Sequence, residues 1–192
     1  ALLLGWQDAN ALSTGRGGPN DWWGDPPQTE LRAYYELGLR VCGVAYQIAN
    51  IFGGGAMDGH MGLSRAGRVL VEEIHHLGMV LDVGGHTGDQ ASFDAIEMSS
   101  GVPVICSHGG VRALANSPRN LSDEMVEAIA KTGGVVGTPA ISDFLVRGKE
   151  MAHMPESPLG TVDNFIAHVE HVMNLVGPDH VGLGTDFTTG QS

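Results

Sequence analysis

The sequence predicts an α/β protein of the (β/α)8 (TIM) barrel class, present as about six βα units, which is an incomplete barrel. Short Val/Leu/Ile-rich runs without polar alternation are typical of parallel strands that are covered on both faces. Longer segments with an apolar period near 3.6 separate these runs and indicate helices. The repeated order of strand and helix predicts βαβ units with right-handed crossovers. A uniform composition over residues 1–192 predicts one domain.

Six apolar runs are expected to form the strands. They are "ALLLG" (1–5), "LRVCGVAY" (39–46), "GMVLDVG" (78–84), "VPVICSH" (102–108), "GGVVGTPA" (133–140) and "HVGLGTDF" (180–187). Many of the 29 glycines lie at the ends of these runs, as tight turns between strands and helices require.

Three segments between the runs have one apolar helical face, and two others show a weaker pattern. The expected helices are 63–77, 121–129 and 162–176, with weaker ones over 28–37 and 88–99. Ser122 can cap the second, and Gly78 and Gly177 mark ends. The irregular segments 13–27 and 146–158 both follow strands, where barrel loops usually determine substrate specificity.

Charge and composition exclude several classes of protein. A net charge of −12 without any Lys/Arg-rich run argues against nucleic acid or an anionic membrane as a partner. No apolar stretch approaches the roughly 20 residues that cross a bilayer, so no membrane insertion is expected. Cys42 and Cys106 lie in apolar runs and are expected to be buried free thiols.

Polar residues at the carboxyl ends of the expected strands are the candidates for chemistry, because TIM-barrel active sites lie at that face. His86 and His108 follow successive strands and can converge on one metal ion. Two histidines that only donate hydrogen bonds in loops are the alternative. Asp186 can act as a metal ligand, as a general base or as a helix cap. Arg119 precedes a helix and can hold a substrate carboxylate, or lie on the surface.

Three stretches together resemble the membrane (renal) dipeptidase family of binuclear zinc peptidases, peptidase family M19. They are "GLSRAGRVLVEEIHHLGMVLDVGGHTG", "VPVICSHGGVRALANSPRNLSDEMVEAIAKTGGVVG" and "DHVGLGTDF". The resemblance runs from about Ala1 to Asp186 and implies a barrel of the metallo-dependent hydrolase type that hydrolyses dipeptides.

The resemblance also implies roles for individual residues. His86 and His108 match the histidines that bind the second zinc, and Arg119 matches the arginine that grips the terminal carboxylate of the substrate. Asp186 matches the aspartate that handles the proton of the attacking water. Tyr46, together with Asn50 in "AYQIAN", is expected to contact the substrate.

The sequence departs from the family pattern in three places. Gln7 stands where the family has a metal-bridging glutamate, and Asp8 could replace that ligand only after a shift of one residue. Tyr46 occupies the position of a substrate-contacting histidine. The family's Asp-x-x-His turn is one residue longer here, from Asp82 to His86, and a bulge could absorb the addition.

The expected function is metal-dependent hydrolysis of dipeptides or similar small amides by a zinc-dependent dipeptidase with one or two zinc ions. A neutral amide at Gln7 weakens the first zinc position, so a mononuclear site is possible. A dipeptidase-like accessory protein that no longer hydrolyses peptides is the alternative, and a lyase or isomerase is a third possibility. The His-x-Asp pair of the family's first strand does not precede Ala1, and the last family helices are absent, so we expect a fragment. A cytoplasmic location and a homodimer are further expectations.

Overall fold

The computed structural model describes residues 3–13, 27–147 and 158–187. Their strands form one six-stranded parallel sheet in which the spatial order, β1-β2-β3-β4-β5-β6, equals the order along the chain. The strands are β1 Leu4–Trp6, β2 Leu39–Gly43, β3 Val80–Asp82, β4 Ile105–Cys106, β5 Val135–Thr138 and β6 Val181–Leu183. Five of them lie inside their predicted runs, and β1 extends one residue beyond the run 1–5, to Trp6. The architecture is therefore the predicted α/β fold with a partial (β/α)8 barrel.

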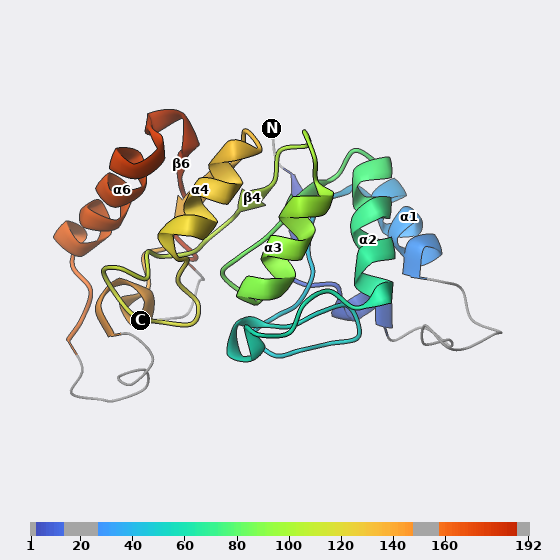
Figure 1. Ribbon diagram of the computed structural model, residues 1–192, viewed down its shortest axis with the longest axis horizontal. Helices are drawn as coiled ribbons and strands as arrows, with labels where there is room; N and C mark the ends of the chain where they lie inside the picture. Colours follow the sequence, from blue (N-terminus) through green and yellow to red (C-terminus); the bar gives the residue numbers. More distant parts are fainter. Residues whose placement is uncertain (1–2, 14–26, 148–157, 188–192) are drawn as a thin grey trace.

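The helices connect successive strands and lie side by side in chain order along one face of the sheet (Figure 1). They are α1 Pro27–Glu36, α2 Arg65–His76, α3 Asp89–Met98, α4 Asp123–Lys131 and α6 Val162–Val176. Short 3-10 helices are η1 Asn10–Ser13, η2 Ala56–Asp58 and η4 Pro178–His180, and η3 Asp143–Arg147 is a π-helix. This single helical layer outside a parallel sheet is what βαβ units with the same handedness produce.

The helix boundaries follow from capping side chains. Ser64 and Ser122 accept hydrogen bonds from the backbone N–H groups of Gly67 and Met125, so α2 and α4 begin just after them. Leu63 and Leu121, predicted to lie on the helices, instead precede these caps. A capping box between Thr161 and Asn164 opens α6.

The hydrophobic core lies between the sheet and the helices. Strand residues on the helix-facing side pack against the apolar faces of α2, α4 and α6, which confirms the periodicity read from the sequence. Fully or almost fully buried members include Cys42, Leu70, Ile74, Leu81, Ile129, Val136 and Val172. Cys42 and Cys106 are both buried and free, as predicted.

Two glycines bring the ends of three strands close together. A Cβ atom at Gly137 in β5, or at Gly184 just after β6, would collide with the carbonyl oxygen of Ser107, which follows β4. The end of β6 therefore approaches the end of β4 although β5 lies between them in the sheet. This approach curves the sheet inward, as a barrel requires.

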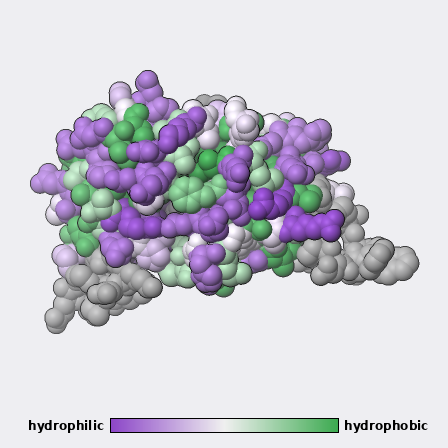
Figure 2. Space-filling model, in the orientation of Figure 1, coloured by the Kyte–Doolittle hydropathy of each residue, from purple (hydrophilic) through white to green (hydrophobic). Residues whose placement is uncertain are grey.

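Hydrophilic and apolar residues are mixed on the helix-bearing surface (Figure 2). Among the described residues, none of the helices is long and apolar enough to span a bilayer. The predicted loop 13–27 lies almost wholly outside the described residues, and so does most of the loop 146–158.

Candidate active site

His86 and His108 meet at the carboxyl end of the sheet. Their Nε2 atoms lie 2.8 Å apart, and both side chains are buried. The rings are close to perpendicular, with centroids 4.7 Å apart and an interplanar angle of 71°. The two imidazoles that the sequence predicted as a metal pair therefore point at a common position.

The turn between β3 and α3 places His86. Gly84 and Gly85 both have left-handed backbone conformations, with φ of 71° and 56°. Two consecutive glycines in this region let the chain turn sharply between β3 and His86. The extra residue of this turn relative to the family pattern stays a prediction.

Ser107 orients the second histidine. Its hydroxyl lies 2.8 Å from Nδ1 of His108, so the opposite nitrogen, Nε2, faces His86. The backbone N–H of Ser107 donates to the Asp82 carboxylate at 2.8 Å. A hydrogen bond at the outer nitrogen fixes the ring orientation and tautomer of a metal-binding histidine.

Two glycines, Gly109 and Gly110, follow His108 and are needed there for their small size. Neither Gly109 nor Gly110 has positive φ. A Cβ atom at Gly109 would collide with Leu121 and crowd the Cys106 thiol, and one at Gly110 would collide with the Asn120 side chain. Their small size lets the loop after β4 pack tightly.

Arg119 and Tyr46 complete a cluster with His86. The Arg119 side chain is buried, its Nε donates to the Gly85 carbonyl at 2.9 Å, and its Nη2 lies 3.2 Å from Nε2 of His86. The Phe144 ring packs against the guanidinium, 4.6 Å from its centroid. Tyr46 stacks on the His86 ring with centroids 4.0 Å apart. The structure therefore brings together Tyr46, His86, His108 and Arg119.

The electrostatics keep the imidazoles neutral. Burial is the largest cause of the lowered pKa of His86, and the charge of Arg119 and the neighbouring His108 lower it further. Burial also lowers the pKa of His108. Neutral imidazole is the form that binds a metal ion. By contrast, burial raises the pKa of Asp82 to about 6.

Asp186 lies at the same end of the sheet, just after β6. Its backbone has φ of 57°, which is uncommon for a residue other than glycine and turns the chain sharply. Burial lowers the pKa values of both His108 and Arg119, and the negative charge of Asp186 partly opposes that lowering. The Asp186 carboxylate is therefore near enough to His108 and Arg119 to affect their pKa values.

Gln7 and Asn50 have different surroundings. Gln7 follows β1 and is exposed, while the neighbouring Asp8 carboxylate accepts hydrogen bonds from Asn10. Asn50 holds its own loop, because its amide donates to the Val44 carbonyl and accepts from Phe52 N–H. In the ranges that the structure describes, no three His, Cys, Asp or Glu side chains form a metal-binding group. The predicted roles of Gln7 and Asn50 stay predictions.

Comparison with known proteins places these residues in a family. The model of "Membrane dipeptidase (Peptidase family M19)" matches residues 25–192. The chain belongs to this family. An uncharacterized protein from Klebsiella pneumoniae is 34% identical over 166 residues, and the dipeptidase tcpJ from Claviceps purpurea is 34% identical over 160 residues. Both alignments cover 82% of this chain.

Two solved structures have the same fold as this chain. An amidohydrolase from Pseudomonas aeruginosa superposes with a TM-score of 0.80 at 33% identity, covering 99% of this chain. A metallopeptidase from Rhodobacter sphaeroides, liganded with a phosphinate mimic of the dipeptide L-Ala-D-Ala, superposes with a TM-score of 0.77 at 27% identity. This chain spans 58% and 35% of the two sequence relatives, and 51% and 49% of the two structures.

Sequence reasoning missed several residues that shape the site. Ser107, directly before His108, offered a signal because a hydroxyl beside a ligand histidine is a common orienting partner. Gly137 and Gly184 offered none, since their role depends on which strands approach one another. Arg112 was also missed, because its partners are distant in the sequence.

Proposed function

We propose that the protein to which this chain belongs is a metal-dependent hydrolase of dipeptides or similar small amides. The observation that carries the proposal is the convergence of the His86 and His108 Nε2 atoms, 2.8 Å apart, beside the buried guanidinium of Arg119. The two neutral imidazole nitrogens suit a metal ion. The guanidinium beside them suits the carboxylate of a small substrate. Membership of the dipeptidase family supports the same reaction.

The donor set fits a divalent ion, and zinc is the proposed one. Two neutral imidazole nitrogens are ligands that zinc favours, and His86 and His108 would hold the ion through the Nε2 atoms that face each other. A bound ion would supply Lewis acidity and lower the pKa of a coordinated water molecule. The exposed neutral amide of Gln7 is a poor ligand, so we expect the site to depend mainly on His86 and His108.

The side chains around His86 and His108 have the proposed roles of binding the substrate and transferring protons. Arg119 binds the terminal carboxylate of the substrate, and its buried position fixes the direction from which that group enters. Asp186 takes the proton of the attacking water and returns it to the leaving amine. Tyr46 lies on His86 and lines the substrate side. Ser107 holds His108 in the orientation that the site needs.

The test uses the full-length protein, measured for bound metal by elemental analysis and for release of amino acids from a dipeptide panel. We expect at least one divalent ion and hydrolysis that a chelator abolishes and zinc restores. The double variant His86→Gln/His108→Gln should lose metal and activity together. His171→Gln is the control, because His171 lies on α6 and contacts Asp123.

Two results would contradict the proposal. Full metal content in the double variant would place the ion elsewhere. Metal bound at the pair without hydrolysis of any dipeptide would favour the accessory protein that binds without cleaving. The homodimer, the cytoplasmic location and the single domain over residues 1–192 stay predictions.

A further inference from the structure

We infer that Arg112 is a positioning residue that ties the loop carrying Arg119 to the first turn of α3, which follows His86. It thereby fixes where Arg119 meets a substrate carboxylate. The inference rests on the proposed function for the role of Arg119. It concerns a side chain that lies outside the cluster around the histidines.

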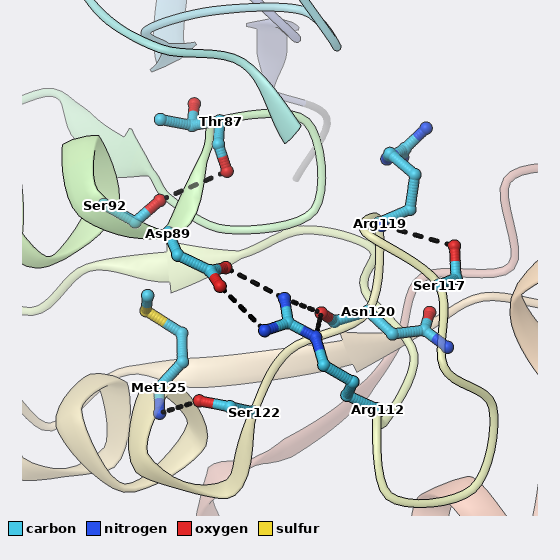
Figure 3. A network of polar contacts seen from close by, with 9 residues as sticks. All are labelled: Thr87, Asp89, Ser92, Arg112, Ser117, Arg119, Asn120, Ser122 and Met125. Carbon is cyan, nitrogen blue, oxygen red and sulfur yellow. Dashed lines mark hydrogen bonds and ion pairs between the residues drawn. The ribbon is translucent and has the colours of Figure 1, made fainter. Parts of the chain in front are cut away.

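The guanidinium of Arg112 bridges two elements (Figure 3). Its Nη1 and Nη2 donate to the two carboxylate oxygens of Asp89 at 2.7 and 2.9 Å. Its Nε and Nη2 also donate to the carbonyl oxygen of Asn120 at 3.0 and 2.6 Å. The guanidinium thus binds Asp89 at the start of α3 and also Asn120, the residue next to Arg119.

The loop from Gly110 to Leu121 is closed at its base. Leu121 N–H donates to the Gly110 carbonyl at 2.9 Å, and Arg112 N–H donates to the Leu121 carbonyl at 2.8 Å. The Asn120 amide donates to the Ala115 carbonyl inside the loop and to the Phe144 carbonyl in η3. Because the loop is held to itself in this way, a contact to Asn120 positions Arg119 as well.

The other end of the bridge is equally fixed relative to His86. Ser92 in α3 accepts from Gly84 N–H and donates to the Thr87 carbonyl. Gly88 N–H donates to the Gly54 carbonyl at 2.9 Å. The segment from Gly84 to Asp89 is therefore held together by hydrogen bonds, and the Arg112–Asp89 pair links this segment to the Arg119 loop.

The position requires arginine for its geometry. A lysine ammonium is a compact point charge without the planar fork that meets a carboxylate and a carbonyl together. The side chains of Arg112 and Asp89 are 28% and 42% exposed, and ion pairs this exposed contribute little to stability. Replacement should therefore leave the fold intact and change the placement of Arg119.

The experiment measures binding of a non-hydrolysable phosphinate dipeptide analogue and of its C-terminal amide to the metal-loaded full-length protein by calorimetry. Wild-type protein should prefer the free carboxylate. Arg112→Lys should reduce that preference about tenfold while binding of the amide changes little, because small misplacements of a binding group are costly. Asp89→Asn, which keeps the shape of the side chain, should give a smaller loss of the same kind.

Arg32→Lys is the matched control, because Arg32 makes a two-pronged pair with Glu73 between α1 and α2. It should keep the wild-type preference. Equal carboxylate preference in wild type and in both Arg112→Lys and Asp89→Asn would overturn the inference and leave the proposed function standing. A wild-type protein that binds neither analogue would overturn the proposed function and this inference with it.

Discussion

At the scale of single residues, the two histidines of the site are supported differently. Nδ1 of His108 contacts the Ser107 hydroxyl, whereas Nδ1 of His86 is buried without a hydrogen-bond partner among the described residues. The His86 ring is held instead by stacking on Tyr46 and by the nearby Arg119. Tyr46, predicted to stand where the family has a histidine, thus packs directly on the His86 ring.

The role of Asp186 leads to a prediction for one substitution. Asp186→Asn should lower kcat by about 10²–10⁴-fold, because an amide cannot accept the proton of the attacking water. Metal content should stay unchanged, since the histidine pair is the proposed ligand set. Steady-state kinetics and elemental analysis of the full-length protein measure the two quantities.

Asp179→Asn is the control for this change, because Asp179 is exposed in η4 and lies away from the sheet end. Loss of metal in Asp186→Asn would make Asp186 a ligand and remove its assigned role as a base.

Much of the cluster could be predicted from single residues. His86, His108 and Asp186 were found because each follows an apolar run, and the ends of parallel strands share one edge of a sheet. Arg119 follows no strand, and its inward direction depends on a loop that Asn120 and Phe144 hold by long-range hydrogen bonds. Such contacts have no local pattern, so the position before a helix made Arg119 a candidate but left a surface arginine as the alternative, and the resemblance to a family favoured the inward one.

At the scale of elements, one histidine joins three segments. His168 in α6 accepts a hydrogen bond from Val111 N–H at Nδ1, at 2.9 Å, and its Nε2 lies 3.1 Å from the Leu145 carbonyl. It is 1% exposed. The helix is thereby connected both to the loop after β4 and to η3. The sequence predicted only a histidine on a helix, because both partners are distant in the chain.

The bonding of His168 predicts a dependence of stability on pH. Burial lowers its pKa, and protonation of Nδ1 would oppose the Val111 N–H group. As pH falls below about 6.5, the unfolded chain takes up this proton and the native state does not, so the free energy of unfolding should fall.

Two substitutions test this expectation by denaturant unfolding of the full-length protein. His168→Leu should cost about 1–3 kcal/mol at pH 7.5, because it leaves a buried donor and a buried acceptor unpaired. His168→Gln keeps a donor and an acceptor and does not titrate, so it should lose less and vary less between pH 7 and pH 5. Identical pH profiles for wild type and His168→Gln would contradict the assignment.

At the scale of the whole molecule, the fold class was predictable because it depends on patterns that repeat along the chain. Alternation of apolar runs and amphipathic segments is enough to predict a parallel sheet covered by helices. The contact that allows the sheet to curve was not predictable, because two glycines that lie 47 positions apart meet the same carbonyl of Ser107. The loops 13–27 and 146–158, which were expected to determine specificity, stay predictions.

The glycine contact predicts the effect of one added methyl group. Gly184→Ala should destabilise the protein by about 1–3 kcal/mol and lower its metal affinity, because the Cβ atom would push Ser107 and the adjoining His108 aside. Gly59→Ala is the control, since a Cβ atom there meets only ordinary contacts. Thermal melting and chelator competition measure the two effects, and equal results for both variants would exclude this account of the curvature.

The burial of both thiols has a practical consequence for labelling. Burial raises the pKa of Cys42 to about 12 and also raises that of Cys106, so neither sulfur presents a reactive thiolate at neutral pH. Maleimide reagents should not react with Cys42 or Cys106 while the chain is folded. A single cysteine introduced on the outer surface of α6 would then be the only labelled position, and the fluorescence of the attached dye could be recorded as substrate is added.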